Sequence, residues 1–300
     1  MARENRVSLW GRLLMDPIIS VDNITKEPLK ASFFLAVVNQ NRDDVFNGED
    51  IIYAEPFVYT QDAELVKEIA TWKKGDMVDV RGVITTLDAK RGAQCIHCGH
   101  QMLRDGEVTL ITPTFVEKRF SDLSDKEAEE ILKKHREVSN TVNLTGFLCD
   151  DVRTEKKAKI YGDIVSRVAY KGLTKYQIAV NRHLFIRSDD PATKTDFPHI
   201  ISVGEQAEKD ALCLHKGSLV SIEGMIVTRN FRRTHTCPAC GQKFDREEKV
   251  TEIIAYGVEY LRDFYEITGS AAEEKARRKD MALKDAMSAL GYKADDEDEE

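Results

Sequence analysis

Two short cysteine motifs carry the most evident chemistry of the chain. They read Cys95-Ile96-His97-Cys98-Gly99 and Cys237-Pro238-Ala239-Cys240-Gly241. Two cysteines at this spacing can grip one side of a tetrahedral metal ion, and the glycine lets the backbone turn so that its amides face the thiolates. One motif supplies only half of a ligand shell. The simplest complete site is therefore one structural Zn²⁺ shared by Cys95, Cys98, Cys237 and Cys240.

Other uses of these cysteines stay open at this stage. Separate or intermolecular metal sites would be completed by His97 or His100 in the first motif and by His235 in the second. A redox pair is disfavoured because neither motif lies where a helix begins after a strand. The remaining two, Cys149 and Cys213, are predicted to be buried thiols.

The cysteine motifs occupy equivalent places in an internal repeat. Several residues recur 142 positions later, namely Gly75 and Gly217, Gly82 and Gly224, Cys95 and Cys237, Cys98 and Cys240, Val116 and Val258. This offset is far longer than a solenoid period of roughly 20–50 residues. The repeat therefore predicts two homologous domains.

Each copy has mainly the pattern of strands. Apolar and polar residues alternate from Val7 to Leu13 and again from Val142 to Leu148, so one face of each strand should be buried. Gly82 and Gly224 interrupt later strands where a small barrel needs a bend or bulge. One short helix is expected in each copy, over Ala63 to Trp72 and over Ala207 to His215. The expected fold is mainly β, with a small barrel in each copy.

Helical segments are predicted between and after the two copies. Ser124 and Glu127 have the spacing of a helix-capping box, at the start of a connector from Ser121 to Asn140. The expected division is residues 1–120 for the first domain, 121–139 for the connector, 140–265 for the second domain, 266–290 for a C-terminal helix, and 291–300 for a disordered acidic tail.

Composition excludes several classes of protein. The chain has 44 Lys and Arg against 52 Asp and Glu, a net charge of −8, of which the six acids from Asp295 to Glu300 supply most. A nearly neutral body argues against tight electrostatic binding of duplex DNA. No apolar run reaches the roughly 18 residues of a membrane span, and no signal peptide is evident, so we expect a cytoplasmic protein without membrane contact. Phosphate-binding loops and nucleophile constellations are also lacking, so we do not expect an enzyme.

Three stretches are informative together, namely the run from Asp196 to Glu208, Lys216 to Gly224, and the opening strand from Asn5 to Leu13. With them the sequence resembles the bacterial single-stranded DNA-binding protein family over nearly all of both copies, and most strongly in the second. The resemblance implies an oligonucleotide-binding (OB) fold used twice in one chain. It also implies binding and protection of single-stranded DNA in replication, recombination or repair. The cysteine motifs are not a family feature. They fall where the hairpin between the fourth and fifth strands belongs, which predicts zinc-binding hairpin tips.

The family's way of binding indicates which side chains would contact DNA. Bases stack on aromatic rings and phosphates contact cations. By alignment with the family, the stacking positions fall on Tyr53 and Phe197. Further aromatic candidates are Tyr59, Phe231, Phe46 and Phe185, and candidate phosphate contacts are Arg42, Arg182, Arg229, Arg232 and Arg233. For any single ring, core packing is the alternative, and for Arg42 and Arg182 it is a solvated surface. The cations around Phe231 lead us to expect stronger binding by the second copy.

Two other functions remain open from the sequence. One is a zinc-stabilised scaffold that binds protein partners, and the other is a binder of single-stranded RNA. The acidic tail could compete with DNA for the basic groove. In the family such a tail recruits replication and recombination proteins through an apolar tip, which is not seen before Glu300. The four-domain family assembly suggests a homodimer.

Overall fold

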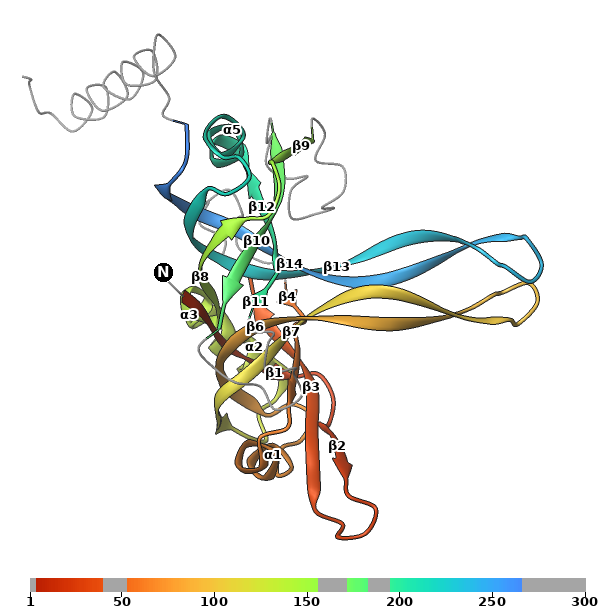
Figure 1. Cartoon of the computed structure of the whole chain (residues 1–300). Coiled ribbons are helices and arrows are strands. Elements are labelled where there is room, and N and C mark those ends of the chain that lie inside the picture. The colour runs from red at the N-terminus through yellow and green to blue at the C-terminus, as the bar shows by residue number, and fades with distance from the viewer. Residues whose placement is uncertain (1–3, 40–52, 156–171, 183–194, 266–300) are drawn as a thin grey trace, which may run out of the picture.

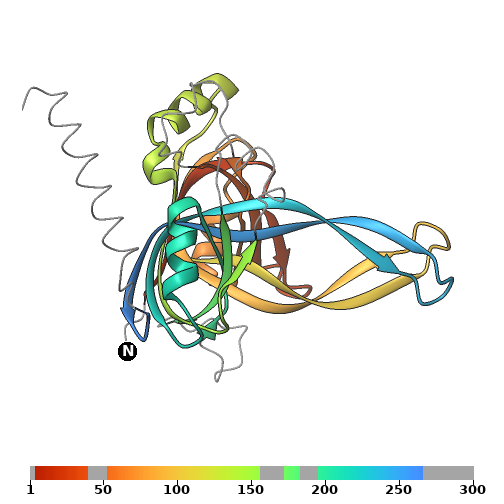
Figure 2. The ribbon, with the colours of Figure 1, turned by 90° about the horizontal axis from the view of Figure 1, so that it is seen from above.

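The computed structural model describes residues 4–39, 53–155, 172–182 and 195–265, and most of these residues are in β-strands. Two barrels lie next to each other, and a long hairpin leaves each of them in the same direction (Figure 1). A view from above shows the two hairpins approaching each other again at their tips (Figure 2). The arrangement places both predicted cysteine motifs at one end of the molecule.

The first barrel is a closed ring of five strands. Its elements are β1 (Glu4–Leu13), β2 (Ile18–Val21), β3 (Pro28–Val38), β4 (Tyr53–Ala54), β5 (Phe57–Thr60), α1 (Ala63–Ile69), β6 (Met77–Gln94) and β7 (Gln101–Phe120). The ring runs β1, β3, β5, β7 and β6, with β5 and β7 parallel and the other pairs antiparallel. Alternate residues of β1 face the core, so Val7, Leu9, Gly11 and Leu13 are buried, whereas the residues between them are only partly buried.

The second barrel repeats this ring strand for strand. Its elements are β8 (Asn140–Leu148), β9 (Arg153–Glu155), β10 (Leu173–Asn181), β11 (Thr195–Asp196), β12 (His199–Val203), α5 (Gly204–Cys213), β13 (Leu219–Thr236) and β14 (Lys243–Arg262). The ring order is β8, β10, β12, β14 and β13, again with one parallel pair, β12 and β14. Val80 lies opposite Val116 in the first ring, and Ile222 lies opposite Val258 in the second. The predicted architecture of two tandem barrels is confirmed.

The predicted glycine bends lie where each hairpin strand turns around its barrel. The register slips at Gly82 and at Gly224, each time next to the partner strand's backbone. A Cβ on Gly82 would lie 2.2 Å from the carbonyl oxygen of Thr112, and a Cβ on Gly224 would lie 2.4 Å from that of Ile254. Only a glycine allows the two backbones to come this close.

The barrels are joined through their first strands. β1 and β8 pair antiparallel, and Val7 lies opposite Val142, its counterpart in the other copy. The two copies therefore meet as two subunits meet across a twofold axis. The buried residues of both rings form one continuous apolar cluster, so this junction is part of the core.

A buried asparagine at this junction should stabilise the fold. The Asn140 side chain accepts the Ile226 N–H and donates to the Ile226 carbonyl, at 2.9 and 2.8 Å. Asn5 bonds Ile84 in the same way, but Asn140 is fully buried whereas Asn5 is partly exposed. We expect Asn140→Ala to lower the free energy of unfolding by about 2–4 kcal/mol, because two buried backbone groups lose their partner.

Asn5→Ala is the matched control for this prediction. Water can replace the lost bonds at the more exposed site, so its loss should be about 1 kcal/mol. Urea denaturation of both variants measures the difference, and equal losses would contradict the role given to burial.

The helical connector differs in detail from its prediction. The capping box of Ser124 and Glu127 is present, and α2 (Asp125–Lys134) packs its apolar face on Val38 and Met77. The predicted single helix is instead broken at His135, which separates α2 from α3 (Arg136–Ser139). Asn140 already belongs to β8, and its buried side chain is held there by its hydrogen bond to the Ile226 carbonyl.

Three other expectations can be compared with the structure. Cys213 is buried as predicted, whereas Cys149 is only partly buried. The second-copy helix begins at Gly204, three residues earlier than expected, and the first-copy helix ends at Ile69. The predicted C-terminal helix and acidic tail lie outside the described residues. Within the described ranges, no helix is both long and apolar enough to cross a membrane.

Candidate nucleic-acid interface and metal centre

Two hairpins carry most of the candidate site. β6 and β7 stay paired from Met77 to Gln94, and β13 and β14 stay paired from Leu219 to Thr236, far beyond the barrels. The strand order β13, β8, β1, β6 puts the two hairpins on either side of the domain junction. They therefore extend side by side (Figure 1).

Each hairpin ends in a cysteine turn of the same geometry. In the first turn, the Cys95 N–H donates to the His100 carbonyl and the Gly99 N–H donates to the Cys95 carbonyl, both at 2.9 Å. Cys237 makes the same pair of bonds with Gln242 and Gly241. Gly99 and Gly241 have φ of 73° and 71°, which glycine adopts without strain.

The four cysteine sulfurs gather at one point between the tips. Cys95 Sγ lies 3.7 Å from Cys240 Sγ, Cys98 Sγ lies 3.6 Å from Cys237 Sγ, and all four lie within 4.8 Å of one another. Tetrahedral thiolates at a Zn–S distance of about 2.3 Å are about 3.8 Å apart. The cluster is therefore able to bind a metal ion, and the sulfurs of both motifs contribute to it.

The histidine alternatives are not part of this cluster. The buried His235 ring stacks on Phe244, and its Nε2 lies 3.5 Å from a carboxylate oxygen of Glu248. His97 Nε2 lies 3.3 Å from the carbonyl oxygen of Lys243. The clustered ligand atoms include neither of these rings nor His100, so the arrangement favours the shared site over two separate ones.

An aromatic ring between two arginines lies on the second hairpin. Arg229, Phe231 and Arg233 alternate along β13 and so share one face. The guanidinium carbons lie 5.4 and 5.6 Å from the centre of the Phe231 ring. This strip faces a cavity of about 310 Å³ whose other wall includes Glu107 of β7.

Carboxylates partly neutralise the cations of this strip. Arg229 makes a two-pronged ion pair with the buried Glu252, at 2.7 and 3.2 Å, and Lys175 binds the same carboxylate. Burial alone would raise the pKa of Glu252, but the hydrogen bonds from Arg229 and Lys175 outweigh it and hold the pKa below its ordinary value. Glu252 therefore stays ionised at neutral pH, and the strip is only weakly cationic.

The floor of the cavity places a histidine beside a carboxylate. Burial lowers the pKa of His199, which lies 3.8 Å from Glu107, and burial with the nearby Asp88 raises the pKa of Glu107. The Gln177 side chain donates to Glu107 at 3.5 Å. A ligand in this cavity would thus meet both charged and polar side chains.

The first barrel presents an aromatic patch that sequence reasoning recognised only in part. Phe34 of β3 and Phe57 and Tyr59 of β5 all face outward, and the rings of Phe34 and Phe57 are 5.1 Å apart. Lys249 of the second hairpin lies over Phe34, 5.4 Å from the ring centre, and pairs with Glu55. Tyr59 was a predicted contact, whereas Phe34 and Phe57 were missed.

Tyr53 and Phe197 are not equivalent positions, contrary to the alignment. Both side chains are 39% exposed. However, Tyr53 lies opposite Val38, while the corresponding residue in the second copy is Thr195, opposite Asn181. The counterpart of Phe197 is Glu55, since their N–H groups donate to Thr86 and Thr228 respectively, at 2.8 and 2.9 Å. The alignment was wrong by two residues.

Arg182 does not serve as the exposed phosphate contact that we expected. Its side chain is only 2% exposed, and its Nε lies 2.5 Å from an Asp196 carboxylate oxygen. Arg232, in contrast, is exposed on the face of β13 opposite to Phe231. Arg42, Phe46 and Phe185 lie outside the described residues.

Comparisons with known proteins agree with this geometry. Residues 139–261 match the single-strand binding protein family. No curated protein matches the chain. The structure resembles the wild-type single-stranded DNA-binding protein from Thermus aquaticus, with a TM-score of 0.54, 17% identity, and 90% of this chain and 99% of that chain covered.

Two further structures are similar. A mutant of the Thermus aquaticus protein gives the same TM-score and identity, with 90% of this chain and 100% of that chain covered. A Plasmodium falciparum SSB complex with single-stranded DNA gives a TM-score of 0.30 and 22% identity, covering 41% of this chain and 98% of that chain. The Thermus likeness supports the two-barrel fold over nearly the whole chain, and the second barrel is the part that matches the single-strand binding protein family.

Proposed function

We propose that the chain binds single-stranded DNA and protects it during replication, recombination or repair. The observation that carries this proposal is the match of residues 139–261 to the single-strand binding protein family. The strip of Arg229, Phe231 and Arg233 and the patch of Phe34, Phe57 and Tyr59 support it. A binding role without catalysis agrees with that family.

Stacking on aromatic rings supplies most of the affinity in this proposal. Each stacked base contributes about 1–3 kcal/mol and any base can stack, so binding would be insensitive to sequence. The candidate rings lie on both barrels, at Phe231 and Phe197 on one and at Phe34, Phe57, Tyr59 and Tyr53 on the other. Arg233 beside Phe231, and the exposed Arg232 on the opposite face of β13, would contact phosphates.

We also propose that Cys95, Cys98, Cys237 and Cys240 hold one structural Zn²⁺. Four thiolates with sulfurs 3.6–3.7 Å apart in two pairs form a donor set suited to zinc. The bound ion would supply a cross-link between the two tips. Ala93, Met102 and Phe244 pack against Cys95 and Cys237 and shield this side of the cluster.

A fluorescence titration with oligo-dT over a salt series tests the DNA-binding proposal. Duplex of the same length is the control, and oligo-U separates DNA from RNA binding. We expect binding to the single strand alone, with log K falling against log salt with a shallow slope of about −2 to −3. The slope is shallow because only about three or four cations contact phosphate and each contributes about −0.7.

A variant that stops at Ala294 tests the tail. Removal of the six acids should tighten binding at low salt, because these charges no longer compete with DNA for the cations. Absence of binding by either form would reject the DNA-binding role and favour a scaffold for protein partners.

A further inference from the structure

We propose that the two hairpins enclose the DNA strand and that the cysteine cluster closes the opening between their tips. This inference rests on the proposed binding of single-stranded DNA. It adds a place for the strand, namely the cavity of about 310 Å³ between the hairpins, and a function for the metal, namely retention of the strand.

The cavity between the hairpins has the chemistry of a nucleotide site. One wall is the Phe231 ring with Arg229 and Arg233 on either side, which offers a stacking surface flanked by two guanidinium groups, of which Arg229 is already paired with Glu252. The opposite wall is the β7 strand of the other barrel, from Arg104 to Glu107. Its volume of about 310 Å³ is at the lower end of small-ligand sites, as expected for a site that holds one unit of a longer strand.

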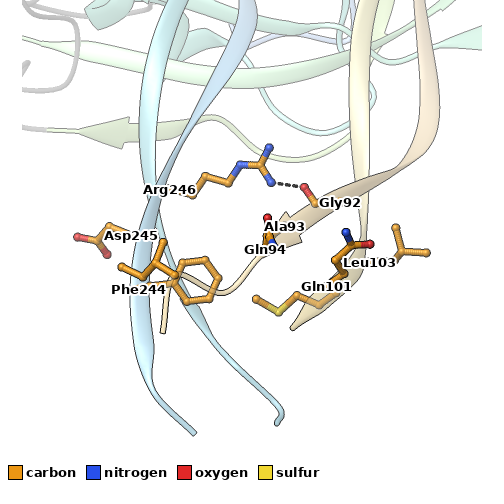
Figure 3. Close-up of a pocket in the computed structure, with 10 residues that line it drawn as sticks. Gly92, Ala93, Gln94, Gln101, Leu103, Phe244, Asp245 and Arg246 are labelled. Carbon is orange, nitrogen blue, oxygen red and sulfur yellow. Dashed lines mark hydrogen bonds between the residues drawn. The ribbon is translucent and has the colours of Figure 1, made fainter. Parts of the chain in front are cut away.

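Contacts within the protein border this cavity at its base, midway along the hairpins and at the hairpin tips. At the base, Glu107 of β7 receives a hydrogen bond from Gln177 of the second barrel. Midway along the hairpins, the Arg246 guanidinium donates to the Gly92 carbonyl, as the dashed line in Figure 3 shows. At the far end, the four cysteines meet. Barrels, hairpins and metal together form a closed loop of protein.

A second cavity of about 720 Å³ lies between the Arg246 contact and the tips. Figure 3 shows that Phe244 of β14 and Leu103 of β7 contribute to its lining from opposite hairpins. Leu103 is 74% exposed and Ile96 is 73% exposed. The exposed apolar side chains give this cavity a surface that bases can contact.

The closed loop changes how DNA can leave the protein. A short linear strand can slide out by its end, but a circular strand has no end and needs the hairpins to separate. While the metal joins the tips, a broken contact between the hairpins re-forms within one molecule at high effective concentration, so separation is slow. Loss of the metal leaves weaker links between the hairpins, namely the Arg246–Gly92 and His97–Lys243 contacts and the packing of Phe244 with Ala93 and Met102.

The test compares the release of circular and linear single strands from the full-length, metal-bound protein. Complexes with a closed circle of about 60 nucleotides and with its linear form are challenged with excess oligo-dT, with and without a zinc chelator. We expect the chelator to speed release from the circle at least tenfold and release from the linear strand less than threefold. Cys98→Ser without chelator should give the same pattern.

Arg246→Ala is a second variant that leaves the cysteines intact. It removes the contact in the middle of the loop, so it should speed release from the circle by a few-fold while the metal content stays unchanged. Equal effects of the chelator on circle and linear strand, or no effect on either, would overturn the enclosure. Failure of the linear strand to bind at all would instead reject the proposed function.

Discussion

Replacing Cys98 with serine should remove the metal from both cysteine motifs at once. The four sulfurs lie within 4.8 Å of one another, so each motif supplies only half of a single shell. A serine hydroxyl is a poor ligand for zinc in place of a thiolate, and two or three ligands do not retain a structural ion. Zinc content, measured by mass spectrometry of the purified protein, should fall from about one ion per chain to less than one tenth.

Cys149→Ser is the matched control, because Cys149 is a partly buried thiol far along the chain from either hairpin tip. It should keep the full metal content. Retention of half of the metal by Cys98→Ser would contradict the shared site and indicate two separate ones. Cys237→Ser should also be measured. If it too retained half of the metal, the result would not be peculiar to Cys98.

Loss of the metal should leave the barrels folded. The apolar residues around the cluster form a small group of their own, separate from the continuous core of the two barrels. We therefore expect the far-UV circular dichroism of Cys98→Ser to match that of the wild type. Amide hydrogen exchange should rise by tenfold or more at the tips, in residues 95–100 and 237–242, because the cross-link no longer holds them.

The fold was largely predictable because the repeat and the alternation of apolar residues are local signals. A constant offset of 142 residues puts the cysteine motifs at the same place on two equivalent hairpins. The sequence could not reveal that these hairpins run side by side. That follows from the pairing of β1 with β8, in which Val7 lies opposite Val142, and a strand pairing between domains has no local signature.

The candidate interface was harder to predict because it depends on register and on distant partners. Phe33 and Phe34 are neighbours of the same residue type, yet Phe33 is buried and Phe34 faces outward. The burial of Arg182 depends on Asp196, which reaches it only when β11 pairs with β10. The alignment paired Phe197 with Tyr53, whereas its counterpart in the structure is Glu55, two residues later. A shift of two residues keeps the side chain on the same face of a strand, so the alternation of the sequence does not reveal it.

Phe231→Ala should weaken binding of single-stranded DNA by about 1–3 kcal/mol, which is roughly a 5- to 150-fold rise in Kd. The ring is the stacking surface of the cavity, and it also keeps the guanidinium groups of Arg229 and Arg233 in place, 5.4 and 5.6 Å from its centre. Its partial exposure means that the barrels do not depend on it for stability. Phe231→Tyr should keep most of the affinity, since a tyrosine ring also stacks. Fluorescence anisotropy with oligo-dT at fixed salt measures all three proteins.

Phe115→Ala is the control for this prediction because it has similar chemistry at a different place. Phe115 is 40% exposed on β7, and the guanidinium carbon of Arg81 lies 5.2 Å from its ring centre, but it does not line the cavity between the hairpins. Its loss should change Kd by less than twofold. If Phe115→Ala weakened binding as much as Phe231→Ala, the strand would follow the outside of the first barrel. The hairpin cavity would then not be the main contact with DNA, because Phe115 would contribute as much stacking free energy as Phe231.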